Sequence, residues 1–248
     1  MRRLIHAQTP MSGHQPPFDR IVFDCDSTLS GIEGIEELAG EHKAQITELT
    51  EQAMAGTVPL EEVYARRLAI VRPLRTAVAT IGRRYIEAAV PQARETMAAL
   101  KMLGKELRIV SGGLRMPVAT FAGWLGIDDA HVHAVQIWFD SDHRVNRFDR
   151  ESPLTRSGGK REVIAALPKK RTAFVGDGMT DAEASQAAEC FICFTGVVAR
   201  PAVMERAHVV VAGPSAADLL PVLCTADELA KLARDPRHGK LVTPPLVP

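Results

Sequence analysis

Two aspartates separated by one residue follow a short apolar run near the start of the chain. Asp24 and Asp26 come after the apolar residues 21–23 and flank Cys25. Side chains alternate along a strand, so both carboxylates should point to one side and Cys25 to the other. Two carboxylates this close repel each other, so either a cation lies between them or one keeps a proton. Either arrangement can serve catalysis, although a single Asp-x-Asp pair is more often part of a turn.

A second acidic pair and two glycine-rich segments have the composition of a phosphate and metal site. Asp177 and Asp181 lie in GDGMTD, whose glycines let the backbone turn tightly. Carboxylate, water and phosphate oxygens are the ligands that Mg²⁺ prefers. The segments SGG, residues 111–113, and SGGK, residues 157–160, offer hydroxyls and backbone N–H groups before helical patterns, and Lys160 adds a cation. Each segment alone is more often an ordinary loop, but together they predict phosphate bound beside Mg²⁺.

Three apolar runs are expected to place these residues at one edge of a sheet. Residues 21–23, 107–110 and 173–175 are predicted to be buried parallel strands, and each ends directly before a polar segment. In an open α/β sheet, ligands bind beyond the carboxyl ends of the strands, so the polar segments should converge. Helical patterns alternate with the strands, which predicts an α/β fold with a doubly wound parallel sheet. We expect these helices at residues 91–103, 115–125, 160–167 and 180–189.

Two segments break the alternation of strands and helices. Residues 31–88 run as several helical stretches with no strand between them, which predicts a helical cap inserted over the crevice. Residues 131–149 contain two strand-like runs around Ser141-Asp142-His143, which predicts a small β-hairpin insertion. The expected domains are therefore a core of residues 18–30 and 89–223 and a cap of residues 31–88.

Composition and the two ends of the chain limit the class of protein. The 248 residues hold 30 Lys and Arg against 30 Asp and Glu, so nothing indicates binding to nucleic acid. No apolar stretch approaches the roughly 20 residues of a membrane helix, and four cysteines fit a reducing compartment. We therefore expect a cytoplasmic monomer or homodimer with no membrane partner. Residues 1–17 are expected to be a flexible extension and residues 224–248 a tail.

Four motifs resemble those of a known enzyme family. FDCDSTL, IVSGG, SGGK and VGDGMTDAEAS stand where the haloacid dehalogenase (HAD) superfamily of aspartyl-phosphate phosphatases has its motifs. Ser27 after the acidic pair, the string SGIEGIEELA and the segment AMAGTVPLEEVYARRLAI are similar to the phosphoserine phosphatase branch. The resemblance covers residues 20 to about 223 and implies a Rossmann-like core with an inserted cap. It also implies a small phosphomonoester substrate and Mg²⁺ as the cofactor.

The resemblance implies a role for each acidic residue. Asp24 would be the nucleophile that forms an aspartyl-phosphate, and Asp26 would be the acid and base. Mg²⁺ would be held by Asp24, the backbone carbonyl of Asp26 and Asp177, with Asp181 at or just beyond these ligands.

The same resemblance implies which groups bind the phosphoryl oxygens. Ser111, the N–H of Gly112 and Lys160 would hold these oxygens and favour the charge spread of the transition state. Thr180 would bind a phosphate oxygen or, alternatively, cap the following helix.

The cap is expected to select the substrate. Glu33 would meet a substrate ammonium and Arg67 its carboxylate, because arginine binds a carboxylate with two parallel hydrogen bonds. A shift of one residue in the alignment would put Arg66 in place of Arg67. Met54 and Leu60 would shield the substrate or, alternatively, belong to the core of the cap. Without the resemblance, Glu33 and Arg67 would be interpreted as exposed helix charges.

Other interpretations stay open. The same chemistry could act on another small phosphomonoester or transfer the phosphoryl group to another alcohol. A phospho-aspartate signalling domain also gathers acidic residues and a lysine around Mg²⁺, but the cap and Asp26 argue against it. Cys190 and Cys193 have the spacing of a redox motif, although the run ECFICF is better explained as a buried strand with core cysteines.

Overall fold

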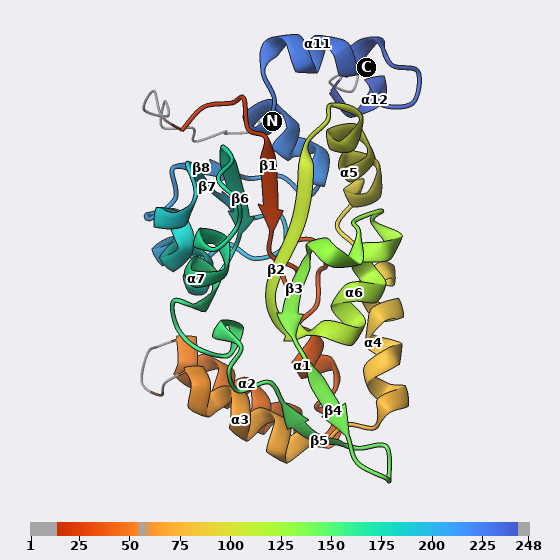
Figure 1. Ribbon diagram of the computed structural model, residues 1–248, viewed down its shortest axis with the longest axis vertical. Coiled ribbons are helices and arrows are strands. Elements are labelled where there is room, and N and C mark those ends of the chain that lie inside the picture. The colour runs from red at the N-terminus through yellow and green to blue at the C-terminus, as the bar shows by residue number, and fades with distance from the viewer. Residues whose placement is uncertain (1–13, 55–57, 59, 243–248) are drawn as a thin grey trace.

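The computed structural model describes residues 14–54, 58 and 60–242, with the backbone alone at 50–54 and 60 (Figure 1). Its centre is a six-stranded sheet of order β3-β2-β1-β6-β7-β8, in which every pair is parallel. The strand order reverses between β1 and β6, which is where ligands bind in doubly wound sheets. The predicted fold class is thus confirmed. The strands are β1 (Arg20–Phe23), β2 (Glu106–Leu114), β3 (Val132–Val135), β6 (Thr172–Gly176), β7 (Cys190–Phe194) and β8 (Val209–Val211).

Helices cover both faces of the sheet because its central strands are apolar on both sides. Ile21 and Phe23 of β1 belong to one hydrophobic cluster, and Val22 between them belongs to another. The alternation of strand side chains therefore supplies both layers. The α-helices are α1 (Gly34–Glu37), α2 (Lys43–Met54), α3 (Leu60–Val71), α4 (Arg75–Glu87), α5 (Ala93–Met102), α6 (Arg115–Trp124), α7 (Gly159–Ala165), α8 (Met179–Glu183), α9 (Pro201–Met204), α10 (Leu220–Leu223), α11 (Ala226–Arg234) and α12 (Gly239–Val242). Short 3₁₀ helices are η1 (Gly40–His42), η2 (Asp129–His131), η3 (Pro153–Thr155), η4 (Ala184–Ala187) and η5 (Ala216–Leu219).

The segment between β1 and α5 folds as helices α1 to α4. Helices α2 and α3 share a small cluster of their own, which includes Ile46 and Val63. Helix α4 instead packs along α6, and its Ile81 and Tyr85 belong to the main core. Figure 1 shows α2 and α3 at one end of the molecule, beyond the carboxyl ends of the strands. These helices therefore lie next to the edge where the polar motifs end.

The predicted hairpin forms and docks on the helical segment. It consists of β4 (Ile137–Phe139) and β5 (Val145–Phe148), which pair antiparallel. The N–H of Val145 donates to the carbonyl of Pro73 at 2.9 Å, and the N–H of Arg75 donates to the carbonyl of His143 at 2.8 Å. The hairpin is thus tied to the connection between α3 and α4.

Two local expectations about strands were wrong. The strand expected to stop at residue 110 runs to Leu114, because a register shift against β3 between Val110 and Leu114 lets β2 continue through the glycines. The run expected to form the first arm of the hairpin divides into two strands. Its first part, Val132–Val135, pairs in parallel with β2, because Val132 and Val135 bury their side chains in the two core layers.

The two ends and the cysteines complete the fold. The ring of His14 stacks on His208 with centroids 3.8 Å apart, and Arg171 donates to the carbonyls of Gln15 and Pro17. Helix α11 buries Leu232 in the main core. Residues 1–13 and 243–248 lie outside the described part.

All four cysteines are buried and free, as the interpretation of ECFICF as a core strand expects.

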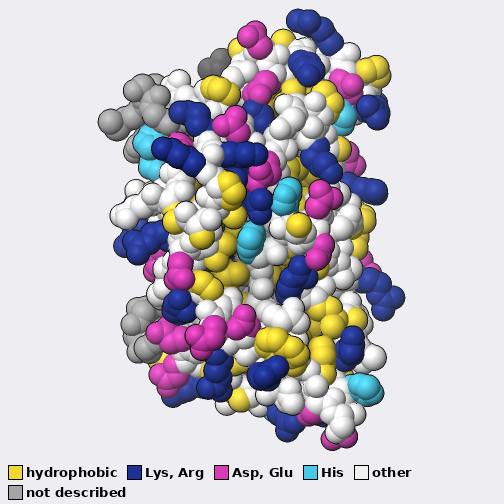
Figure 2. Space-filling model, in the orientation of Figure 1, with side chains coloured by type: hydrophobic (Ala, Val, Ile, Leu, Met, Phe, Trp, Pro, Cys, Tyr) yellow, Lys and Arg dark blue, Asp and Glu magenta, His cyan; other side chains and the backbone are white. Residues whose placement is uncertain are grey.

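Charged side chains of both signs lie on the surface of the molecule. On the face in Figure 2, basic and acidic side chains are interspersed over most of the surface. Within the described ranges, no helix has the length and apolar character needed to span a membrane.

Candidate active site

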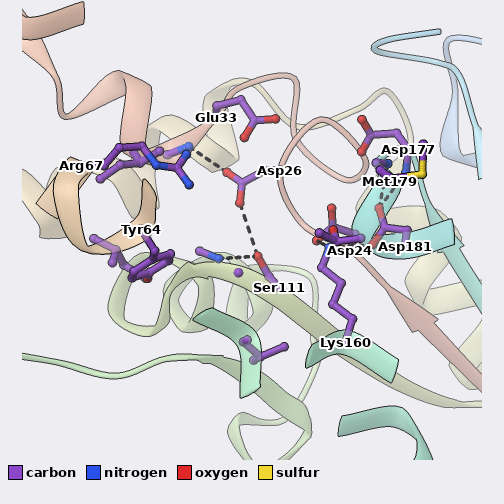
Figure 3. A pocket seen from close by; sticks show the side chains of 18 of the residues that line it. Asp24, Asp26, Glu33, Tyr64, Arg67, Ser111, Lys160, Asp177, Met179 and Asp181 are labelled. Atoms are coloured by element: carbon purple, nitrogen blue, oxygen red, sulfur yellow. Dashed lines mark hydrogen bonds and ion pairs between the residues drawn. The ribbon is translucent and has the colours of Figure 1, made fainter. Parts of the chain in front are cut away.

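Three carboxylates from two neighbouring strand ends form a buried cluster. Asp24 follows β1, and Asp177 and Asp181 follow β6, the parallel neighbour of β1. One carboxylate oxygen from each lies within 4.8 Å of the others, and all three residues are buried (Figure 3). The convergence predicted from the strand ends is therefore present.

Backbone donors and a glycine hold the second acidic pair in place. Asp181 Oδ2 accepts hydrogen bonds from the N–H groups of Asp177 and Gly178 at 3.1 and 2.9 Å. A Cβ at Gly176 would come within 2.4 Å of the Asp181 carboxyl carbon, so this position requires glycine. Thr28 Oγ1 donates to Asp177 Oδ1 at 2.7 Å, which links the segment after β1 to the one after β6.

Lys160 bridges two of the carboxylates. Its Nζ lies 2.8 Å from Asp24 Oδ1 and 2.6 Å from Asp181 Oδ1, and the residue is only 8% exposed. These two carboxylates hold the pKa of Lys160 above its ordinary value despite its burial. Burial, followed by repulsion from Asp181, raises the pKa of Asp24 to about 8, and the attraction of Lys160 opposes that rise. We call Asp24, Lys160, Asp177 and Asp181 the acidic floor.

Arg200 is a member of the site that the sequence analysis missed. Its Nη1 forms an ion pair with Asp177 Oδ2 and lies 3.4 Å from the Asp177 carbonyl oxygen. It precedes α9 after the carboxyl end of β7, which is the same sheet edge. The rule that polar residues after strands converge could have identified it.

The charges of the cluster fit a divalent cation. Three carboxylates face two cations, Lys160 and Arg200. The raised pKa of Asp24 indicates that these cations do not fully offset the buried negative charge. Oxygen ligands at this spacing suit a hard divalent ion. We infer that Asp24, Asp177 and Asp181 could hold such an ion.

Asp26 lies apart from this cluster and is held by other donors. Its Oδ1 accepts hydrogen bonds from Tyr85 Oη at 2.6 Å and from the N–H of Gly34 at 2.8 Å. Ser111 Oγ donates to Asp26 Oδ2 at 3.4 Å and itself accepts from the N–H of Gly113 at 2.9 Å. The Asp26 side chain is therefore placed between the acidic floor and the helical segment, as Figure 3 shows.

Helices α1 and α3 supply the opposite side of the same cavity, which encloses about 170 Å³. Glu33, just before α1, and Tyr64 and Arg67 of α3 line it, and we call these three residues the cap wall. Arg66 instead forms an ion pair with Glu62 on the surface. The structure thus places Arg67, and not Arg66, at the cavity.

The charged groups of the cap wall are disfavoured by burial. Burial and the nearby Asp26 raise the pKa of Glu33 to about 7, although Ser27 Oγ donates to its carboxylate at 2.6 Å. Burial lowers the pKa of Arg67. Tyr64 Oη is buried with no hydrogen-bond partner among the described residues. The sequence analysis missed Tyr64, which is one helical turn from Arg67 on the same face of α3.

The remaining predicted residues divide into two groups. Gly112 and Thr180 line the cavity, and Thr180 lies inside α8, whose N-cap is Gly178. Its alternative interpretation as a helix cap is therefore wrong. The predictions for Met54 and Leu60 concern side chains outside the described part.

Comparison with known proteins identifies the family. A family model described as haloacid dehalogenase-like hydrolase matches residues 18–189. The chain belongs to this family. Phosphoserine phosphatase of Bos taurus is 36% identical over 197 residues, which make up 77% of this chain and 87% of that protein. This HAD-like hydrolase is a phosphomonoester hydrolase.

Solved structures show the same fold. A phosphoserine phosphohydrolase-like protein from Francisella tularensis subsp. tularensis SCHU S4 is 24% identical with a TM-score of 0.75, and the match covers 83% of this chain and all of that chain. A substrate-bound phosphoserine phosphatase is 24% identical with a TM-score of 0.72, covering 85% of this chain and all of that one.

Proposed function

We propose that this HAD-like hydrolase is a Mg²⁺-dependent phosphatase that hydrolyses O-phospho-L-serine. The observation that carries the proposal is a single cavity with the acidic floor at one end and Glu33 and Arg67 at the other (Figure 3). The floor suits a phosphate bound to a metal ion, and the cap wall offers one group for an ammonium and one for a carboxylate. Similarity to phosphoserine phosphatases supports this substrate.

Asp24 is the nucleophile in this proposal. One of its carboxylate oxygens bonds to phosphorus while the bond from phosphorus to the serine oxygen breaks, which gives an aspartyl-phosphate. Lys160, in contact with Asp24 Oδ1, orients the carboxylate and donates to the phosphoryl oxygens. Bound Mg²⁺, held by Asp24, Asp177, Asp181 and the Asp26 carbonyl, would offset the carboxylate charge and keep Asp24 ionised beside a phosphoryl oxygen.

Asp26 moves the proton in both steps. It gives a proton to the departing serine oxygen, and then takes one from the water that attacks the phosphorus of the aspartyl-phosphate. The bond between Asp24 and phosphorus breaks in this second step, so the Asp24 carboxylate is restored and inorganic phosphate is released. Ser111 Oγ accepts from Gly113 and donates to Asp26 Oδ2 at 3.4 Å, and in this proposal the Ser111 proton turns from this long bond to a phosphoryl oxygen when substrate binds.

The helical segment selects the substrate and limits water. We propose that residues 31–88 act as a cap over the core, with Glu33 facing the ammonium of phosphoserine and Arg67 its carboxylate. Gly112 and Thr180 line the cavity and complete the phosphoryl site in this proposal. A closed cavity also protects the aspartyl-phosphate from stray water.

The test is a panel of phosphomonoesters assayed for phosphate release with Mg²⁺ and with chelator. The panel contains L-phosphoserine, D-phosphoserine, phosphothreonine, phosphoethanolamine, sugar phosphates and 4-nitrophenyl phosphate, with Asp24→Asn as the blank. We expect strong preference for L-phosphoserine, lost with chelator and in the blank.

Two results would contradict different parts of the proposal. Activity on 4-nitrophenyl phosphate without activity on L-phosphoserine would disprove the substrate and keep the catalytic assignments. Full activity of Asp24→Asn would disprove the nucleophile.

A further inference from the structure

The two oxygens of the Asp26 carboxyl group have different surroundings. Oδ1 accepts hydrogen bonds from Tyr85 Oη at 2.6 Å and from the Gly34 N–H at 2.8 Å. Oδ2 accepts one long hydrogen bond, from Ser111 Oγ at 3.4 Å, and so keeps a lone pair for a proton at the cavity. A carboxyl oxygen that accepts two hydrogen bonds has no lone pair left for a proton. A proton carried by Asp26 is therefore directed to Oδ2, which faces the phosphoryl site.

Tyr85 is suited to act as a fixed donor. It is 0% exposed, and its ring packs on Phe121 with centroids 5.8 Å apart. Burial raises the pKa of its hydroxyl, so the group stays protonated and can only donate to a carboxylate. The tyrosine hydroxyl is thus a permanent donor to Oδ1.

The backbone around Tyr85 is tied to the segment that follows the acidic pair. Ser30 Oγ donates to the Tyr85 carbonyl at 3.1 Å, and the Gly31 N–H donates to the Ala88 carbonyl at 2.8 Å. These bonds connect the last turn of α4 to the loop that carries Asp26. The distance between the Tyr85 hydroxyl and Asp26 is therefore set by rigid elements on both sides.

Gly34 and Tyr85 fit each other at the same point. A Cβ at position 34 would lie 2.1 Å from Tyr85 Oη, so no side chain larger than hydrogen is compatible with this placement of the hydroxyl. The absence of a side chain lets both donors reach one carboxyl oxygen. The Gly34 N–H and the Tyr85 hydroxyl together form a binding site for Asp26 Oδ1.

We propose that Tyr85 is a positioning residue for Asp26, which holds Oδ1 so that Oδ2 carries the transferred proton. This inference rests on the proposed function, because that proposal makes Asp26 the acid and base. Tyr85 acts through Asp26 and has no contact with substrate in this scheme.

Two substrates with different leaving groups can show whether Tyr85 positions the acid Asp26 or only supports the structure. Departure of the serine oxygen needs a proton, because an alkoxide is a poor leaving group, whereas 4-nitrophenolate leaves without one. A badly placed Asp26 should therefore slow the first turnover of phosphoserine and spare that of 4-nitrophenyl phosphate.

The decisive variant is Tyr85→Phe, which keeps the ring and removes the hydroxyl. With Mg²⁺ and excess enzyme, we expect first-turnover release of serine to fall about tenfold and release of 4-nitrophenol to change less than about twofold. An equal loss on both substrates would overturn the inference, because it would indicate a structural defect. Unchanged rates on both substrates would overturn it as well.

A second variant tests the path through Asp26. In an Asp26→Asn background there is no acid to position, so adding Tyr85→Phe should change serine release less than about twofold. A further tenfold loss in that background would overturn the inference. Wild-type protein that hydrolyses neither substrate would overturn the proposed function itself, which distinguishes the two failures.

Discussion

The acidic floor and the cap wall line the same cavity but treat their charges differently. In the floor, Lys160 lies within 2.8 Å of two carboxylates, and these neighbours keep its ammonium charged despite burial. In the cap wall, burial lowers the pKa of Arg67 and raises that of Glu33, because the charges nearby do not overcome it. Burial likewise raises the pKa of Asp24 in the floor, so the contrast lies in the two cations, Lys160 and Arg67. In the floor, the protein itself thus stabilises the buried cation. In the wall, an oppositely charged ligand would stabilise the charged forms of Glu33 and Arg67.

The difference follows from the elements that carry the two regions. The three carboxylates of the floor follow the adjacent parallel strands β1 and β6, and the pairing of Phe23 with Val175 fixes their relative positions. Lys160 reaches them from the start of α7. Wall residues lie at or on the helices α1 and α3, which reach the cavity by tertiary packing alone. In the proposed function, the sheet therefore places the catalytic carboxylates, and the inserted helices carry the residues that select the substrate.

Removal of Lys160 should have the largest effect on the floor. In Lys160→Met, buried carboxylates lose their shared cation, so we expect unfolding free energy in chelator to fall by about 3–5 kcal/mol. Lys170→Met is the matched control, because Lys170 forms a surface ion pair with Glu106 at 2.6 Å and is 43% exposed. That variant should cost less than about 1 kcal/mol.

Urea denaturation at two pH values checks this expectation. The deficit of Lys160→Met should shrink at lower pH, because protonation removes the uncompensated carboxylate charge. Similar losses in the two lysine variants would show that the floor does not depend on its internal ion pairs.

The same contrast explains what the sequence could predict. Asp24 and Asp177 follow apolar runs, and parallel strands bring such segments together wherever the helices lie. Lys160 was predicted from its glycine-rich segment, which opens α7. Arg200 also follows a strand, β7, so the same rule could have predicted it from the sequence. The contact of Tyr85 with Asp26 could not be predicted, because it spans 59 residues and depends on how α4 packs against α6. No local pattern encodes that packing.

Replacement of Arg67 tests the wall. Lysine keeps the charge but cannot form two parallel hydrogen bonds with a carboxylate, so Arg67→Lys should lower kcat/KM for L-phosphoserine by about 10- to 100-fold. Phosphoethanolamine lacks the carboxylate, and its kcat/KM should change less than about threefold. Arg66→Lys is the control, because Arg66 pairs with Glu62 on the surface.

Steady-state kinetics with both substrates distinguishes recognition from damage. Equal losses on both substrates would contradict a carboxylate contact at Arg67. An effect of Arg66→Lys as large as that of Arg67→Lys would contradict the placement of Arg67 at the cavity.

Glu33 should make stability depend on pH. Its pKa is about 7 in the folded protein against an ordinary value of 4.5, so folding favours its protonated form. That contribution is fully present below pH 4.5 and is lost as the pH rises through about 7. Glu33→Gln should therefore be more stable than wild type at about pH 8 and should gain nothing at acidic pH. Thermal unfolding across this range without substrate is the measurement, and a gain of equal size at both ends would contradict the raised pKa.

The two tyrosines give the smallest and sharpest contrast. Tyr64 Oη is buried without a hydrogen-bond partner in the described part of the chain, whereas Tyr85 Oη donates to Asp26. A buried unsatisfied hydroxyl destabilises a protein, so Tyr64→Phe should raise the unfolding free energy by about 1 kcal/mol, and Tyr85→Phe should lower it by a similar amount. Both variants keep the ring and its packing, on Phe148 for Tyr64 and on Phe121 for Tyr85. Changes of opposite sign in the unfolding free energy, measured by urea denaturation, would show that the Tyr64 hydroxyl destabilises the fold. They would also show that the hydrogen bond from Tyr85 to Asp26 stabilises it. Equal signs would remove that distinction.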